Sequence, residues 1–383
     1  MKFKKKLVLG ITISGSTPLI KGQARFFAEN GYDVYLMCPK DAKSIKYCED
    51  EGCILLPINI ERYINPVKDI LTVLKIINKL KRLKPDIVNV GTPKMGLLGS
   101  IGAYLAKVPK IIYTCRGLRY EHEKGFMRKL LITTEKIPGK LCHKIICISP
   151  SVKKQAIKDY IFKDSKIVVF KKGSSNGINL NKFSLNSLNT ETIKELKIKY
   201  NLKGKFVYGL VGRLIDRKGI NELYEAFDDL STNNSNLKLL LVGKSDKSQL
   251  HDRSLIEKIK NHKSITWVGW QDNIPLYMSL IDVFVMPAWW EGFGNSYLEA
   301  AAMQKPVIGT NGTGCIDAIK KDFNGLVIPI KKVEPLKKAM LKYYLDSDLR
   351  RIHGENGLKW VKNFKPEDIW QEQKKLYEQN INL

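Results

Sequence analysis

The chain has 383 residues, enough for two domains of ordinary size, and its 44% hydrophobic and 27% charged residues are typical of a globular protein. No apolar run reaches the roughly 18–20 residues of a membrane-spanning helix. The apolar stretch Leu7–Ile13 runs into polar sequence at Lys21 without a small-residue cleavage site, so we expect neither a secreted nor an integral membrane protein. Seven cysteines without a Cys-x-x-Cys pair indicate reduced thiols in a cytoplasmic protein and no metal site.

The net charge of +27 is concentrated in the first half of the chain. Residues 1–180 hold 34 Lys and Arg against 14 Asp and Glu, whereas the remainder holds 31 against 24. Lysine dominates, as is typical of AT-rich coding, but such a bias does not by itself place the excess in one half. A basic first half indicates an anionic partner, which leaves a membrane surface, a lipid phosphate or a nucleic acid.

In the first half, short apolar runs alternate with helical patterns. The runs predict buried parallel strands at Lys6–Ile13, Val34–Cys38, Ile54–Ile58, Ile87–Val90, Ile111–Thr114, Ile145–Ile148 and Ile167–Phe170. Between them, apolar residues at helical spacing predict helices at Ile20–Asn30, Val67–Leu83 and Gly96–Lys107.

The second half repeats this scheme. Its predicted strands are Phe206–Val211, Leu237–Val242, Ile265–Val268, Val283–Met286, Pro306–Gly309 and Gly325–Ile328. Helices are expected from about Ile220, Leu255, Pro275, Tyr297, Glu334 and Asp346. Such alternation predicts an α/β protein with two doubly wound, Rossmann-like domains, whose ligands bind at the carboxyl ends of the strands in a cleft that the domains face across.

The break between the halves is expected at Leu185–Thr192, a polar stretch without periodicity. We therefore predict a first Rossmann-like domain over 1–184 and a second over 193–362. Residues 363–383 are expected to form a helix that crosses back to the first domain.

The densest motif is Pro287-Ala-Trp-Trp-Glu-Gly-Phe-Gly-Asn-Ser-Tyr-Leu-Glu299, which follows a strand and opens a helix. Its glycines allow close backbone approach to a ligand, and the first N–H groups of the helix favour an anion. Glu291 lies at the mouth of this turn and Glu299 one turn inside the helix. The alternatives are a solvated loop acid for Glu291 and, for Glu299, a capping box with Ser296.

A second motif, Val211-Gly-Arg-Leu-Ile-Asp-Arg-Lys-Gly219, also joins a strand to a helix. Arg213, Arg217 and Lys218 stand just before a helix N-terminus, where the helix dipole disfavours positive charge. An anion at the same site would explain this placement. Surface lysines and arginines of a basic chain are the alternative.

The two motifs, together with Asn176-Gly-Ile-Asn and the following Phe183, resemble the family 4 retaining glycosyltransferases of the GT-B fold. The segments Pro85–Gly99 and Val108–Gly117 are similar to the capsular and exopolysaccharide branch of that family. The resemblance covers nearly the whole chain, with its motifs in the expected order.

This resemblance implies transfer of a sugar from a UDP-sugar with retention, and without a metal or other cofactor. It also implies that the first domain (1–184) binds the acceptor and the second (193–362) binds the nucleotide-sugar. In the family the first Glu contacts the donor sugar, the second binds the ribose, and the basic pair holds the diphosphate, so Glu291, Arg213 and Lys218 are the expected catalytic residues. The expected donor-binding residues are Gly15, Ser16, Arg213, Lys218, Glu291, Gly292, Phe293, Gly294, Asn295 and Glu299. Many relatives carry His where this chain has Arg116, and a guanidinium is no base at neutral pH.

Basic residues gather where the acceptor is expected to bind. The expected acceptor-side residues are Lys94, Arg116, Arg119 and His122. Phe126 and Leu130–Ile132, beside Lys124 and Arg128, suggest a helix that lies on an anionic membrane, and a solvated basic face is the alternative.

We expect a cytoplasmic enzyme, peripheral on the inner face of the cell membrane. It would transfer an N-acetylhexosamine or its 6-deoxy form to a sugar on a polyprenyl diphosphate in capsule, O-antigen or exopolysaccharide assembly. A transferase with a soluble or protein acceptor is the alternative. A non-catalytic scaffold and a nucleic-acid-binding protein are more remote, because the motif residues are intact and no specific nucleic-acid-binding signature is found.

Overall fold

The computed structural model describes residues 4–61, 65–232 and 234–380, and the chain forms two compact units. The first unit extends to Gly177 and resumes at Pro366, and the second is Ile178–Lys365. The chain leaves the first unit after Gly177, earlier than the predicted boundary at residue 184. It returns to the first unit at Pro366, later than the predicted residue 363. The reason is local: Ile178 and Phe183 are buried, and the backbone N–H of Ile178 donates to the carbonyl of Phe364, 2.8 Å away within the second unit.

The first unit is built on a seven-stranded parallel sheet in the order β3-β2-β1-β4-β5-β6-β7. Every strand predicted in the first half is present, with ends that shift by a few residues. The strands are β1 (Lys5–Gly10), β2 (Tyr32–Cys38), β3 (Ile54–Pro57), β4 (Ile87–Gly91), β5 (Lys110–Cys115), β6 (Lys144–Cys147) and β7 (Ile167–Val168).

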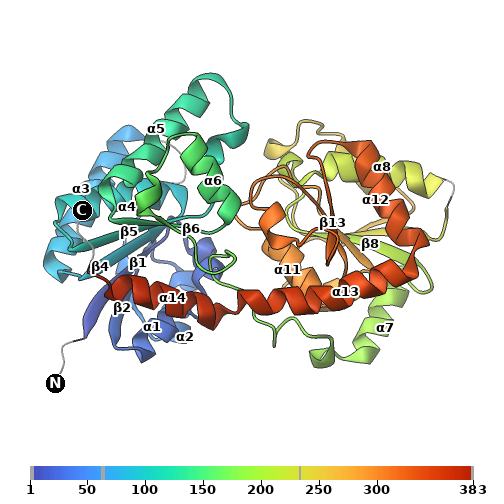
Figure 1. Cartoon of the computed structure of the whole chain (residues 1–383), viewed down its shortest axis with the longest axis horizontal. Helices are drawn as coiled ribbons and strands as arrows, with labels where there is room; N and C mark the ends of the chain where they lie inside the picture. Colours follow the sequence, from blue (N-terminus) through green and yellow to red (C-terminus); the bar gives the residue numbers. More distant parts are fainter. Residues whose placement is uncertain (1–3, 62–64, 233, 381–383) are drawn as a thin grey trace. The chain divides into compact units, whose positions relative to one another are not determined.

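Helices cover both faces of this sheet, and a separate hydrophobic core lies under each face (Figure 1). Ile76, Met95 and Tyr113 belong to one core, and Phe27 and Tyr377 to the other. The helices are η1 (Ser14–Ile20), α1 (Gln23–Glu29), α2 (Ala42–Glu51), α3 (Pro66–Leu83), α4 (Pro93–Leu105), η2 (Arg119–His122), α5 (Gly125–Leu141), α6 (Pro150–Lys158), η3 (Asp164–Lys166) and α14 (Pro366–Glu378).

The last helix, α14, packs on the first unit, as predicted. Figure 1 shows it in dark red beside the blue helices α1 and α2. The rings of Tyr377 and Phe27 are 5.0 Å apart, and the ring of Trp370 packs against Phe26 at 5.5 Å. Asn89 Nδ2 on β4 donates to the hydroxyl of Tyr377 at 2.7 Å, so α14 also completes the buried polar contacts of the sheet.

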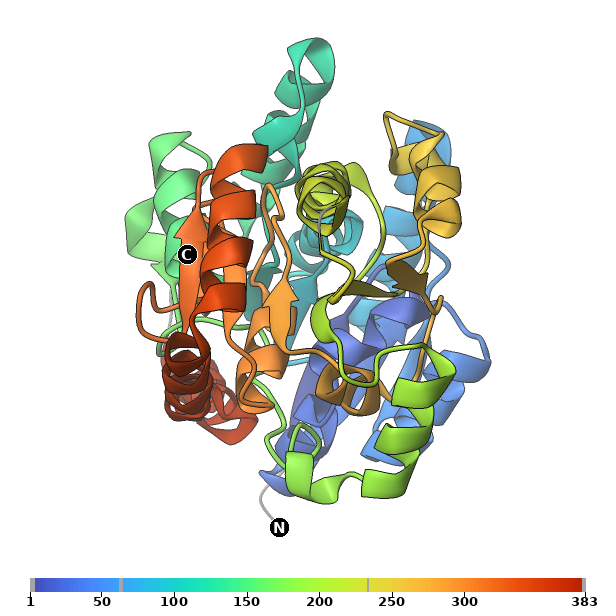
Figure 2. The same ribbon diagram turned by 90° about the vertical axis from the view of Figure 1, so that its right-hand side faces the viewer.

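The second unit contains a six-stranded parallel sheet in the order β10-β9-β8-β11-β12-β13, covered by helices on both faces (Figures 1 and 2). Its strands are β8 (Phe206–Val211), β9 (Leu237–Val242), β10 (Ile265–Trp267), β11 (Val283–Val285), β12 (Val307–Thr310) and β13 (Gly325–Ile328). Its helices are η4 (Leu185–Ser187), α7 (Thr190–Lys199), η5 (Asp216–Lys218), α8 (Ile220–Thr232), η6 (Lys247–Gln249), α9 (Leu255–Asn261), α10 (Ile274–Ser279), α11 (Asn295–Ala302), η7 (Ile316–Ala318), α12 (Val333–Leu345), α13 (Ser347–Val361) and η8 (Lys362–Phe364).

In each sheet the strand order reverses at one position, between β1 and β4 in the first and between β8 and β11 in the second. Parallel sheets with such a reversal bind ligands beyond the carboxyl ends of the two strands that flank it, because the connections there diverge to opposite faces. Both motifs of the second half follow the strands that flank this position.

Candidate active site

The two motif loops of the second unit are held against each other by their backbones. Gly219 ends η5 with a φ of 73°, and a Cβ at this position would lie 2.1 Å from the carbonyl oxygen of Pro287. The N–H of Trp289 donates to the carbonyl of Arg217 at 2.9 Å. Only glycine fits where the chain approaches this closely at positive φ, so Gly219 sets the distance between the loops.

This arrangement brings Glu291 to the basic residues of the other loop. Oε1 of Glu291 lies 2.7 Å from Nζ of Lys218 and 3.0 Å from Nη1 of Arg217. The side chains of Glu291 and Lys218 are only 14% and 12% exposed, so the ion pair is largely shielded from water. The alternative of a solvated loop acid at Glu291 is therefore wrong.

The charge state of Glu291 follows from these neighbours. Burial acts to raise the pKa of its carboxyl, but the nearby cations outweigh burial and lower this pKa, with Lys218 and Arg217 the strongest among them. Arg213, which is exposed, contributes in the same direction. The site thus contains an ionised carboxylate among three cations, and it carries a net positive charge.

Arg217 belongs to this site although it was not among the predicted site residues. Its guanidinium stacks over the ring of Trp290 at 4.6 Å and donates to the backbone carbonyl of that residue at 3.1 Å. The motif itself showed a third cation before the helix. Its pairing with Glu291 depends on β8 and β11 being neighbours in the sheet, which the sequence did not show.

Glu299 lies on α11 and is half-buried. Burial raises the pKa of its carboxyl to about 7, against a weaker opposing effect of Lys182 and Lys218. The alternative of a capping box with Ser296 is wrong: the helix begins at Asn295, its N-cap is Gly294, and no side chain caps it. Glu299 therefore does not cap the start of this helix.

The remaining predicted residues of this loop shape the backbone. A Cβ at Gly294 would lie 2.3 Å from Cδ2 of Tyr297, so a side chain there would displace that ring. Phe293 is buried against Phe364, with ring centroids 5.5 Å apart. Gly292 is also buried, and Oδ1 of Asn295 is buried without a hydrogen-bond partner among the described residues.

The predicted site residues of the first unit follow the carboxyl ends of its strands. Gly15 and Ser16 lie in η1, where the N–H of Ser16 donates to the carbonyl of Ile13 at 3.0 Å. Arg116 directly follows β5, and Arg119 and His122 lie in η2.

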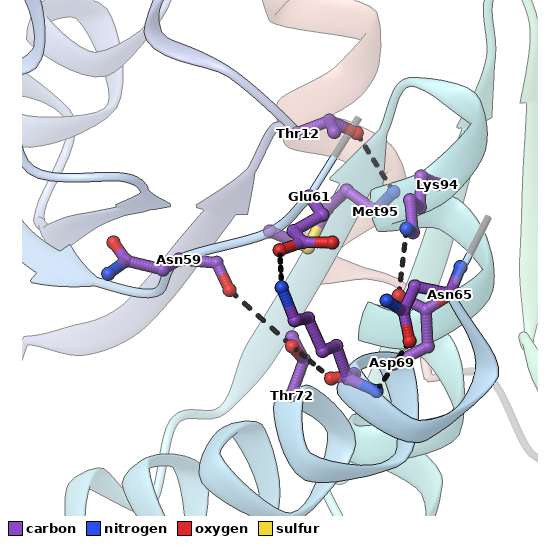
Figure 3. Close-up of polar contacts among 9 residues, drawn as sticks. Thr12, Asn59, Glu61, Asn65, Asp69, Thr72, Lys94 and Met95 are labelled. Atoms are coloured by element: carbon purple, nitrogen blue, oxygen red, sulfur yellow. Dashed lines mark hydrogen bonds and ion pairs between the residues drawn. The ribbon is translucent and has the colours of Figure 1, made fainter. Parts of the chain in front are cut away.

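Lys94 differs from the expected open acceptor-side cation, because its ammonium group forms an ion pair. Its Nζ lies 2.8 Å from Oδ1 of Asp69 at the start of α3, and both side chains are less than one-fifth exposed, 14% and 18% (Figure 3). Nearby, Thr12 Oγ1 accepts from the N–H of Met95 at 3.0 Å, which joins β1 to the start of α4. Figure 3 also shows Asn65 capping α3, with Oδ1 accepting from the N–H of Lys68.

Two further properties concern the whole of the described chain. None of the helices in residues 4–61, 65–232 and 234–380 is both long enough and apolar enough to traverse a bilayer. In the same residues, no three His, Cys, Asp or Glu side chains are grouped as metal ligands.

Comparison with known proteins identifies the family of the chain. Residues 13–181 match the family described as Glycosyltransferase Family 4, and residues 192–360 match Glycosyl transferases group 1. The chain is similar to the capsular polysaccharide biosynthesis glycosyltransferase CapM of Staphylococcus aureus, with 35% identity over 96% of this chain and 95% of CapM. The UDP-Gal:alpha-D-GlcNAc-diphosphoundecaprenol alpha-1,3-galactosyltransferase of Escherichia coli is 30% identical over 81% of this chain and 80% of its own length.

Among solved structures, Anabaena HepE in complex with UDP and glucose has a TM-score of 0.82 at 16% identity, covering 98% of this chain and 100% of HepE. WaaG, described as a glycosyltransferase of lipopolysaccharide biosynthesis, has a TM-score of 0.76 at 18% identity over 97% of this chain and 99% of WaaG. These likenesses establish the GT-B fold. The chain belongs to the family 4 glycosyltransferases, in the capsular branch, which confirms the predicted family and fold.

Proposed function

We propose that this glycosyltransferase is a retaining, metal-independent enzyme that moves a sugar from a UDP-sugar to a sugar carried on a polyprenyl diphosphate. The E. coli relative is named for a UDP-sugar donor and a diphosphoundecaprenol acceptor. A Campylobacter jejuni relative is named for N-acetylgalactosamine transfer to a diphospho-undecaprenol acceptor. With the capsular name of the S. aureus relative, these names support a role in capsule, O-antigen or exopolysaccharide assembly, with an N-acetylhexosamine or its 6-deoxy form as the sugar.

The observation that carries this proposal is the cluster of Lys218 and Arg217 around Glu291. As the glycosidic bond of a UDP-sugar breaks, negative charge builds up on the departing diphosphate. Cations that the fold already holds in place stabilise that charge without reorganising, which is the role that Mg²⁺ has in other transferases. The diphosphate competes with Glu291 for Lys218, which releases the Glu291 carboxylate to contact the sugar.

Glu299 supplies the second contact to the donor. A half-buried carboxylate without a close counter-charge accepts hydrogen bonds well, and the two hydroxyls of a ribose are suitable donors. Glu299 lies on α11 and Glu291 in the loop before it, which is consistent with the two carboxylates contacting opposite ends of one nucleotide-sugar.

Apolar side chains on two helices of the first unit support a peripheral membrane location on the cytoplasmic face. On α5, Phe126 is 78% exposed, beside the exposed Lys124. A larger stripe, which the sequence analysis did not single out, runs along α3 at the spacing i, i+3, i+4, i+7. Its members are Val67, Ile70, Leu71 and Leu74, between 51% and 70% exposed. Apolar residues beside lysines are suited to the boundary between lipid headgroups and acyl chains.

Calorimetric titration of UDP, GDP, ADP and CDP into the protein with EDTA present tests the donor. Selective UDP binding is expected. Tight GDP or ADP binding would instead identify a GDP-sugar or an ADP-sugar as the donor and leave the assignment as a glycosyltransferase unchanged. Transfer from UDP-N-acetylhexosamines to polyprenyl-diphosphate-linked sugar, again in EDTA, tests acceptor and metal independence together. NMR of the product's anomeric proton then decides between retention and inversion, and activity that requires added Mg²⁺ would contradict the metal-independent mechanism.

A further inference from the structure

Arg116 occupies an unusual position at the carboxyl edge of the first sheet. It directly follows β5, and its guanidinium extends over the end of the neighbouring β4: a Cβ at Gly91 would lie 3.0 Å from Nε of Arg116. Nε and Nη1 are hidden from solvent, and neither has a hydrogen-bond partner in the part of the chain that the structure describes. Buried guanidinium N–H groups are normally paired, because leaving them unpaired costs free energy.

Among the residues that the structure describes, no carboxylate contributes to compensating this charge. Burial lowers the pKa of Arg116 to about 10, so the group stays protonated at neutral pH, and the side chains that act against burial are tyrosines. The fold therefore holds a cation here without a protein anion to pair with it.

The surroundings are polar but neutral. Arg116 lines a small cavity with Gln23, Asn89 and Thr114. These three residues belong to one buried hydrogen-bonded series: Thr114 Oγ1 donates to Asn89 Oδ1 at 2.9 Å, and Gln23 Nε2 donates to Gln373 Oε1 on α14 at 2.9 Å. The side chains of this series hydrogen-bond to one another. The guanidinium of Arg116 is the one charged group among the residues that line the cavity.

A second feature of the same edge also favours an anion. The 13-residue helix α4 begins at Pro93, immediately after Gly91 and Thr92; its N-cap Thr92 makes no side-chain cap, and in its first turn Thr12 Oγ1 accepts from the N–H of Met95. Thr92 has a φ of 71°, a conformation that a β-branched residue rarely adopts, and it is held there by its Oγ1, which accepts from the N–H of Thr12 at 3.0 Å. The positive end of the helix dipole thus adds to the charge of Arg116.

We propose that Arg116 binds an oxygen of a substrate diphosphate at this edge of the first unit. The inference rests on the proposed function, which supplies two diphosphates, that of the UDP-sugar and that of the polyprenyl acceptor. A guanidinium presents several N–H donors to a phosphate group, which a histidine at this position would not do. Gly91 is then a positioning residue, since it leaves room for Nε.

Binding is tested without turnover, by calorimetric titration of inorganic pyrophosphate and of UDP into the wild type, Arg116→Met and Arg116→Lys. Arg82→Met, which removes an exposed arginine of α3 in the same unit, is the matched control. To remove the contribution of the second unit, the pyrophosphate series is repeated with Lys218→Met in every protein. We expect Arg116→Met to weaken pyrophosphate binding about tenfold or more, Arg116→Lys to retain part of it, and Arg82→Met to match the wild type.

Two further measurements distinguish whether the donor or the acceptor supplies the diphosphate. If the donor supplies it, the Kd for UDP rises about tenfold in Arg116→Met. If the acceptor supplies it, the Kd for UDP is unchanged, and the KM rises for a polyprenyl-diphosphate-linked sugar but not for the same sugar on an uncharged alkyl glycoside.

Gly91→Ala keeps the charge of Arg116 but displaces its guanidinium, so it should weaken pyrophosphate binding several-fold. Because this variant retains Arg116, it also shows whether the loss in Arg116→Met comes from misfolding. Unchanged pyrophosphate and UDP affinities in Arg116→Met, with only a change in Tm, would overturn the inference and make Arg116 a structural residue. A wild type that binds pyrophosphate through Arg116 but transfers no sugar would refute the proposed function and leave the anion site standing.

Discussion

Oε1 of Glu291 lies 2.7 Å from Nζ of Lys218, and each group is the main compensation for the buried charge of the other. An ion pair of this kind adds little net stability, but removing one partner is costly because the other charge is left desolvated and alone. In a transferase the same pair can be exchanged for a bound diphosphate. Stability without ligand and affinity for ligand are therefore linked at this position.

Glu291→Ala should abolish sugar transfer and leave the Kd for UDP within a few-fold of the wild type, because the proposed contact of Glu291 is to the sugar. The ligand-free variant should lose about 3 kcal/mol of unfolding free energy, since Lys218 keeps its charge without its partner. Urea unfolding with and without UDP measures this, and because the two Kd values are similar, UDP should stabilise the wild type and the variant by nearly the same amount. Glu334→Ala, at an exposed carboxylate of α12, is the control. A hundredfold loss of UDP affinity would show that Glu291 serves nucleotide binding instead.

Glu299→Ala should weaken UDP binding by about 1–3 kcal/mol, or roughly five- to 150-fold in Kd, if two ribose hydroxyls donate to its carboxylate. Titration of UDP and of 2′,3′-dideoxy-UDP measures the effect. The variant should lose the preference for the nucleotide that carries both hydroxyls. A lower Tm with unchanged affinity for both nucleotides would assign Glu299 a purely structural role.

Glu299→Gln should change the pH dependence of stability. Burial raises the pKa of Glu299 from 4.5 to about 7, so between these values the folded state binds more protons than the unfolded state. The wild type therefore loses stability as pH rises through this window. The uncharged variant escapes that loss and should be more stable by about 3 kcal/mol at pH 8, with the difference vanishing towards pH 4. Urea unfolding across this range tests it, and a difference independent of pH would contradict the assignment.

Ile70→Ser with Leu74→Ser should reduce binding to vesicles rich in phosphatidylglycerol, because both side chains lie on the exposed stripe of α3. Vesicle sedimentation at low salt should show a severalfold smaller bound fraction and little change in UDP affinity. Leu345→Ser removes an equally exposed leucine, 72% accessible, from α12 of the second unit and should have no effect. Equal losses of vesicle binding in both variants would mean that charge or nonspecific hydrophobic contact, and not the exposed stripe of α3, controls vesicle binding.

Tyr377→Phe removes the hydroxyl that accepts hydrogen bonds from Asn89 Nδ2 at 2.7 Å and from Gln373 Nε2 at 2.5 Å. Two buried amides then lack a partner, which should cost about 1–3 kcal/mol of unfolding free energy. Tyr160→Phe, at a tyrosine that is 85% exposed, is the control and should stay within about 0.5 kcal/mol of the wild type. Equal stability of the two variants would contradict a structural role for this contact.

The sheets could be predicted from sequence because buried parallel strands are short apolar runs between polar loops. Phe206–Val211 and Leu237–Val242 have the predicted bounds for this reason. The exposed stripe of α3 could not be anticipated in this way. Its apolar residues have helical spacing, yet Thr72, Ile76 and Leu80 are the buried positions, and the direction that a helix faces depends on its packing partners.

The site was predicted in part. Glu291, Lys218 and Glu299 stand out as charged groups beside glycines at the start of helices. The pairing of Arg217 with Glu291 spans 74 residues of sequence and exists only because β8 and β11 are adjacent. The start of α11 at Asn295 rather than after Ser296 likewise depends on contacts that the sequence does not specify, among them the N–H of Gly294 donating to the carbonyl of Gly314 at 3.1 Å.

The position of α14 has a consequence for how the protein is made. The segment that fills the core of the first unit with Ile369, Leu376 and Tyr377 leaves the ribosome after the entire second unit. While the second unit is translated and folds, the seven strands of the first unit therefore lack α14, and one apolar face of their sheet stays partly uncovered. Chains released before residue 366 would expose that face permanently, which makes prematurely ended products ready targets for chaperones and proteases.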